Sequence, residues 1–128
     1  MAGTLTTGLT ISSNDMSDKK TLSISVSDSL SIGGKSVARQ VVTSDTETLL
    51  LDASDYTGTT WVYLKNMSST ATEIIHITEG SIAGTHIMDL GAKEFALFPW
   101  SADTNLNFDC DISATPTLEY RTWQVGNN

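Results

Sequence analysis

The two histidines of the chain, His76 and His86, are its first candidates for chemistry. Asp89 follows His86 at a distance of three residues, so a strand pair that brought both imidazoles together would create a site of two nitrogens and one carboxylate. Neutral imidazole nitrogen suits zinc or iron. One hypothesis is therefore a metal-dependent enzyme, and its distinguishing feature would be an approach of His76 to His86 within reach of a metal ion.

The residues around His76 argue against the best-known metal-binding β-barrel pattern. Cupins need two histidines one residue apart and a following Glu, whereas Ile74 and Thr78 stand two residues before and after His76. We therefore expect strand histidines with hydrogen-bonded rings. The histidines, the cysteine and the carboxylates look unclustered, so we predict no required metal and no cofactor.

Cys110, the single cysteine, stands between Asp109 and Asp111. Flanking carboxylates disfavour the thiolate that nucleophilic chemistry needs, and alternation along the segment makes Cys110 a small buried side chain. The two carboxylates point the other way, where a glycosidase pair or Ca²⁺ ligands are conceivable. Neither a bend nor an aromatic cleft is evident nearby. We expect a solvated polar face instead, paired with Arg121 or Lys65 across strands.

Three tryptophans are candidates for recognition, because exposed aromatic side chains anchor protein interfaces and can stack on sugars. Trp61 heads an apolar segment, and we expect it to be buried. Trp100 follows Pro99 at a strand end, where we expect a rim or interface position. An exposed Trp100 or Trp123 in a groove would favour a carbohydrate- or receptor-binding module. No set of catalytic residues stands out, so we predict that the protein is not an enzyme.

β-Strands must position these residues. Alternation of apolar and polar residues with period two, typical of a half-buried strand, is clearest in residues 105–112 and recurs in residues 21–27. About nine to eleven such segments, with turn signals about every 8–12 residues and no convincing helix, predict an all-β fold. We expect an antiparallel two-sheet sandwich or jelly roll. Its predicted core contains Leu64, Ile75, Ile77, Phe95, Leu97, Leu106, Phe108, Cys110 and Ile112.

Residues 1–20 differ from the rest in their sparse apolar content. We expect them to form an extended N-terminal arm outside a single sandwich domain of residues 21–128. The apolar set of the arm, Leu5, Leu9 and Ile11, is too small to fold alone. Pairing with a sheet edge of a neighbouring subunit would satisfy both its backbone and these side chains, and the alternative is a frayed terminus.

Composition excludes several classes of function. The net charge of −8 opposes nucleic-acid binding and docking to an anionic membrane. No apolar run approaches the ~20 residues of a membrane span, and the first residues lack the pattern of a secretory signal. The 16 serines and 19 threonines replace the usual charged surface. A single cysteine fits synthesis in a reducing compartment.

Two segments carry a resemblance to a known class of proteins. Residues 61–66 (WVYLKN), followed by a Ser/Thr turn, and residues 90–100 (LGAKEFALFPW) resemble core strands of small structural proteins of tailed bacteriophages. A closing strand with Leu118-Glu119-Tyr120 also fits, so the resemblance covers about residues 46–120.

The resemblance implies a virion structural protein, a capsid decoration (cement) subunit that stabilises the phage head. It implies the major capsid protein as partner, a homo-oligomer with a trimer favoured, and a place on the capsid surface after synthesis in the host cytoplasm. It supplies no catalytic residues. From the residues themselves we expect an interface at Leu5, Leu9, Ile11 and Trp100. A carbohydrate- or receptor-binding β-sandwich module of a fibre or tail is the alternative.

Overall fold

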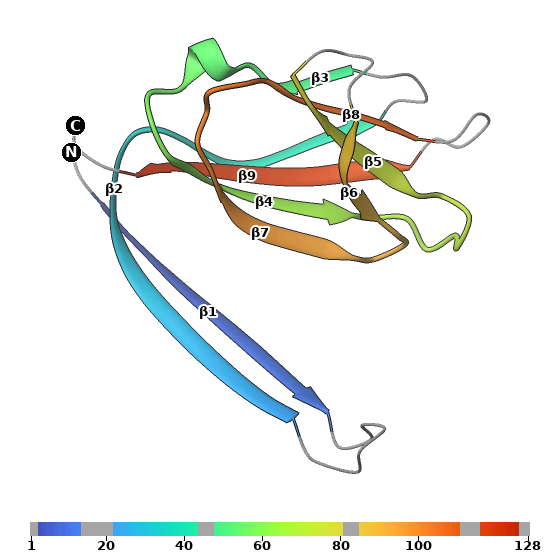
Figure 1. Cartoon of the computed structure of the whole chain (residues 1–128), viewed down its shortest axis with the longest axis horizontal. Coiled ribbons are helices and arrows are strands. Elements are labelled where there is room, and N and C mark those ends of the chain that lie inside the picture. Colours follow the sequence, from blue (N-terminus) through green and yellow to red (C-terminus); the bar gives the residue numbers. More distant parts are fainter. Residues whose placement is uncertain (1–2, 14–21, 44–47, 81–84, 111–115, 126–128) are drawn as a thin grey trace.

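The computed structural model describes residues 3–13, 22–43, 48–80, 85–110 and 116–125, which form two antiparallel sheets packed as a sandwich (Figure 1). The predicted all-β sandwich is thereby confirmed. In chain order the strands are β1 (Gly3–Ser13), β2 (Leu22–Thr43), β3 (Thr48–Leu51), β4 (Thr60–Asn66), β5 (Ile75–Glu79), β6 (His86–Leu90), β7 (Phe95–Trp100), β8 (Leu106–Cys110) and β9 (Thr117–Val125).

The five-stranded sheet has the order β1-β2-β9-β4-β7, and the four-stranded sheet has the order β3-β8-β5-β6. The described part of the chain adds one 3₁₀ turn, η1 (Ala53–Asp55), whose first turn is capped by the carboxylate of Asp52. None of the helical structure described here is long and apolar enough to cross a membrane.

The core lies between the two sheets and follows the period-two alternation of their strands. In β4, Val62 and Leu64 are fully buried, whereas Trp61, Tyr63 and Lys65 point to the outer face and are partly exposed. Burial of each large apolar side chain contributes about 1.5–3 kcal/mol to folding. The buried cluster contains Leu51, Val62, Leu64, Ile75, Ile77, Leu90, Trp100, Leu106, Phe108 and Leu118.

Most of the predicted core is confirmed, with two errors on β7 and one on β4. The confirmed residues are Leu64, Ile75, Ile77, Leu106, Phe108 and Cys110. Phe95 and Leu97 are 64% and 40% exposed. Side chains alternate along β7, so burial of Trp100 at its end places these two residues, an odd number of positions away, on the outer face. Trp61 faces outward as well, and Ile112 lies outside the described residues.

Buried Asn66, at the end of β4, ties the two sheets together. Its side-chain Nδ2 donates to the carbonyl oxygens of Glu73, at 2.7 Å, and of Leu90 in β6, at 3.0 Å. Its Oδ1 accepts from the backbone N–H of Ser68 at 3.0 Å. A fully buried amide is stable here because these three bonds replace the ones it would make with water.

The first strand is not a lone arm. β1 pairs with the first half of β2 over its whole length, from Gly3 opposite Ile32 to Ser13 opposite Leu22, and together they form a hairpin that projects from the sandwich (Figure 1). The projecting part therefore includes residues that the sequence assigned to the sandwich domain. The segment joining the two strands, residues 14–21, lies outside the described residues.

β2 carries the chain from this hairpin into the five-stranded sheet without a break. The strand does not end at Gly33-Gly34 but runs on to Thr43 and pairs with β9. Register shifts between Ile32 and Ser36 mark an irregularity at this point. The two glycines thus lie between Ile32, the last residue of β2 that pairs with β1, and Ser36, from which β2 continues its pairing with β9.

The hairpin has two chemically different faces. The register places Leu9 opposite Val26 and Ile11 opposite Ile24 on one face, where all four side chains are 41–55% exposed. Neighbouring pairs such as Thr10 and Ser25 lie on the other face, and there the residues are Ser, Thr and Gly. The alternation that predicts a half-buried strand is thus present, but its apolar face is not covered by the sandwich.

Candidate functional site

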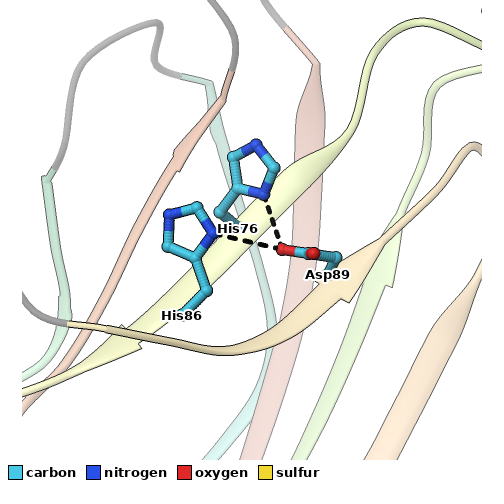
Figure 2. A group of neighbouring side chains, drawn as sticks. All are labelled: His76, His86 and Asp89. Atoms are coloured by element: carbon cyan, nitrogen blue, oxygen red, sulfur yellow. Dashed lines mark hydrogen bonds and ion pairs between the residues drawn. The ribbon is translucent and has the colours of Figure 1, made fainter.

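His76, His86 and Asp89 gather on the outer face of the four-stranded sheet (Figure 2). Nδ1 of His76 lies 2.6 Å from Oδ1 of Asp89, and Nδ1 of His86 lies 3.5 Å from the same oxygen. The two imidazole rings are stacked, with centroids 4.3 Å apart and an angle of 14° between their planes. One atom from each of the three side chains can be chosen so that all lie within 4.8 Å of one another.

A β-bulge in β6 creates this cluster. His76 pairs with Asp89 and Ile77 pairs with Met88, but Thr78 pairs with His86, so Ile87 is an extra residue in β6. In a regular strand, residues three apart point to opposite faces. The extra residue reverses this alternation and turns His86 toward the same face as Asp89, as bulges do next to functional sites.

A further carboxylate lies on the other side of His76. In the sheet, His76 is flanked by Asp89 of β6 and by Asp109 of β8. Oδ1 of Asp109 is buried and has no hydrogen-bond partner in the described part of the structure, which is rare for a buried polar atom. The side chain of His76 is 15% exposed, whereas those of His86 and Asp89 are 46% and 57% exposed. The cluster is thus open to solvent on one side.

Two expectations from the sequence are wrong at this site. The histidines and carboxylates are clustered, because the bulge turns His86 and Asp89, three residues apart, to the same face, which a regular strand does not do. Asp109 does not pair with Arg121 or Lys65, since both of those residues belong to the other sheet. The position of Asp111 lies outside the described residues.

A groove separates the hairpin from the outer face of the five-stranded sheet. It encloses about 430 Å³, and its walls include Leu9 and Val26 of the hairpin and Trp61, Phe95 and Leu97 of β4 and β7. Both walls are therefore largely apolar. A second hollow of about 360 Å³ lies beside it and shares Leu97 among its lining residues.

The residues predicted for an interface fall into two groups. Leu9 and Ile11 are exposed on the apolar face of the hairpin, and Leu5 on the same face is partly buried and lines the second hollow. Trp100 does not lie at a rim. It is 6% exposed, its Nε1 donates to the carbonyl of Thr104 at 3.1 Å, and its ring packs edge-on against Tyr56 with centroids 5.4 Å apart.

Two aromatic residues line the second hollow, and the sequence singled out only one of them, Trp123, as a groove candidate. Tyr63 and Trp123 lie there with Arg121, whose guanidinium carbon is 5.8 Å from the centre of the Tyr63 ring. Glu119 is 3.9 Å from the Arg121 guanidinium, and the buried Nε of Arg121 has no hydrogen-bond partner in the part of the chain described. Side chains alternate between the two faces along β4 and β9. Once the buried face of each strand was known, this alternation could have identified Tyr63, Arg121 and Trp123 as residues of the outer face.

No protein-family model matches the chain, and neither a curated protein nor a solved structure matches it significantly.

Proposed function

We propose that this chain is a non-enzymatic structural subunit of a virion, a capsid decoration (cement) protein that acts as a homo-oligomer. The observation that carries the proposal is the projecting hairpin with an exposed apolar face. An isolated two-stranded ribbon is marginally stable in water, and exposed contiguous apolar surface marks a site of interaction. Burial against another subunit would remove four exposed apolar side chains from water and thereby stabilise the assembly: Leu9, Ile11, Ile24 and Val26.

The facing wall of the groove supports the same proposal. Phe95 and Leu97 are exposed opposite the hairpin, so the two apolar surfaces lie across an open groove. A chain with a net charge of −8 resists association through its polar surface, and an apolar interface overcomes that repulsion.

The virion and the capsid surface enter the proposal through the resemblance of residues 61–66 and 90–100 to strands of phage structural proteins. A trimer is favoured because it matches the three-fold positions of an icosahedral lattice. There, one set of subunits with projecting hairpins would clamp adjacent capsomers. The major capsid protein is the partner in this proposal.

The test is the native mass of the purified protein followed by a sedimentation assay with purified phage shells. We expect a homo-oligomer, with three copies favoured, that co-sediments with the shells and raises the temperature at which they disassemble. A monomer that leaves the shells unchanged in both respects would refute the proposal. A stable oligomer of another order would correct only the number of copies.

A carbohydrate- or receptor-binding module is the second candidate, and Trp123 is the observation that favours it. Trp123 and Tyr63 line the second hollow beside Arg121, and aromatic faces with a nearby hydrogen-bond donor suit a sugar. If this is the function, the protein binds a host surface polysaccharide and Trp123→Ala abolishes that binding. The assembly proposal predicts no saccharide binding. Binding of the wild type and of Trp123→Ala to an array of bacterial polysaccharides is the measurement.

A further inference from the structure

The cluster on the outer face of β5 and β6 has the chemistry of a metal site. Zinc binds imidazole nitrogen and carboxylate oxygen at about 2.0–2.2 Å, so two ligand atoms of a tetrahedral ion stand about 3.4 Å apart. The 3.5 Å separation of His86 Nδ1 and Asp89 Oδ1 already has this value. The 2.6 Å separation of His76 Nδ1 and Asp89 Oδ1 is that of a hydrogen bond. It opens by a rotation of Asp89, whose side chain is largely exposed.

We propose that His76, His86 and Asp89 bind one divalent first-row transition-metal ion, with zinc as the reference ion. Both Nδ1 atoms point toward the carboxylate of Asp89, so an ion at their meeting point contacts all three side chains (Figure 2). The ion takes the place of the proton that Nδ1 of His76 and Oδ1 of Asp89 share. This inference is independent of the proposed function.

The bulge in β6 is the first structural support. A bulge interrupts the sheet ladder, and its effect here is to place His86 next to His76 and Asp89 rather than on the opposite face of the strand. The stacked rings then present their Nδ1 atoms to a single oxygen. This convergence of three ligand atoms goes beyond what an isolated hydrogen bond between one His and one Asp requires.

The second support is the charge around His76. Asp89 and Asp109 occupy the cross-strand positions on both sides of this residue, so two carboxylates flank one imidazole. Oδ1 of Asp109 is buried without a hydrogen-bond partner among the described residues, and an anionic oxygen in that position is stabilised by a nearby cation. A dication at the cluster supplies that positive charge. Asp109 itself is a neighbouring charge in this proposal and is not one of the three ligands.

The ligand set indicates the class of ion. Two imidazoles and a carboxylate suit zinc, nickel, copper or iron, whereas magnesium and calcium prefer sites made of oxygen alone. Three protein ligands leave at least one position open, and it faces solvent because His86 and Asp89 are exposed. Such an ion is exchangeable, and the core lies on the inner face of the sheet. Stoichiometric binding of an ion through His76 or His86 would overturn the sequence-based prediction that the protein has no required metal.

The binding test uses the untagged full chain, first stripped with a chelator and then titrated with zinc chloride in a calorimeter. We expect one ion per chain. Cobalt(II) added in place of zinc should give the visible absorption of a nitrogen- and oxygen-ligated ion, and zinc should displace it. Nitrogen-15 shifts of the imidazole rings should report ligation at Nδ1 of both histidines. The alternative is a pair of histidines bridged by Asp89 that holds no ion, and it predicts none of these signals.

Three variants assign the ligands. His86→Ala and Asp89→Asn each remove an exposed ligand, and each should weaken zinc binding at least about tenfold, as loss of even an outer partner does. Asp109→Asn should weaken it less, because only a neighbouring charge is lost. The matched control is Asp103→Asn, which removes an exposed carboxylate outside the cluster and should leave the affinity unchanged.

Circular dichroism of each variant establishes that the sandwich is intact before binding is compared. Absence of stoichiometric binding by the wild-type chain overturns the proposal outright. Equal affinity of the wild type and of His86→Ala overturns the assignment to this cluster, whatever the wild-type chain binds elsewhere. The calorimetric titration of the wild-type chain tests the proposal by itself, so the proposal remains testable even if a variant fails to fold.

Discussion

Replacing Phe108 by alanine is expected to lower the free energy of unfolding by about 3–5 kcal/mol. Phe108 lies in the middle of β8, pairs with Thr48 of β3 and with Ile77 of β5, and is 2% exposed. Removal of the ring loses its burial and leaves a cavity that rigid neighbouring strands cannot close. Urea denaturation followed by tryptophan fluorescence measures the change.

Phe95→Ala is the matched control for this prediction. The same atoms are removed from β7, but Phe95 is 64% exposed on the outer face, so the expected change is about 0.5 kcal/mol or less. A similar loss of stability from both substitutions would contradict the assignment of the inner and outer faces. The comparison is to be made at a protein concentration at which the subunit is monomeric, because Phe95 lines the groove of the proposed interface.

The strands of the core could be predicted from the sequence because polar and apolar residues alternate there without ambiguity. Between Leu106 and Cys110 the apolar side chains have one orientation, and polar Asn107 and Asp109 separate them. Only one assignment of faces is then compatible with a buried core. The same reasoning gives Ile75 and Ile77, which flank His76, and all of these predictions are confirmed.

The faces of β7 could not be predicted, because both of its faces are apolar. Phe95 and Leu97 alternate with Ala96 and Phe98, so period two identifies the two sets without deciding which one is buried. Burial of Trp100 decides it, and Trp100 is held by Tyr56 and Thr104, which contact it only after the loops are placed. The wrong predictions for Phe95, Leu97 and Trp100 thus have a single physical cause.

The candidate metal cluster could be named from the sequence but not assembled from it. His76, His86 and Asp89 are the right residue types, yet regular alternation puts His86 and Asp89 on opposite faces. The bulge at Ile87 changes this, and no glycine or proline in β6 marks its position. A sequence pattern gives the period of a strand and does not give the place where the period is interrupted.

The hairpin raises the same difficulty for function. Ile24 and Val26 alternate with serines as in any half-buried strand, but the surface that covers them is not the sandwich. Local alternation predicts that an apolar face will be covered, and only the tertiary position shows that the described part of the sandwich leaves these side chains exposed. The hairpin is for this reason the element on which the assembly proposal is most directly tested.

A double substitution on the apolar face of the hairpin, Leu9→Glu with Val26→Glu, is expected to abolish oligomer formation and binding to phage shells. The two residues are cross-strand partners that line the groove, and carboxylates at their positions cannot be buried in an apolar interface without a large cost. Native mass spectrometry and co-sedimentation with shells are the measurements. The sandwich should still unfold at the wild-type temperature, because neither residue belongs to its core.

The control is Thr10→Glu with Ser25→Glu, the neighbouring cross-strand pair on the Ser/Thr face of the hairpin. Both double variants add two carboxylates and take the net charge from −8 to −10, and both place like charges directly opposite each other. Both variants therefore add like charges to the hairpin at neighbouring positions, and the face that carries them is the main difference. If the apolar-face variant assembles and binds shells as well as the control does, the apolar face of the hairpin is not the interface, and the observation that carries the assembly proposal fails with it.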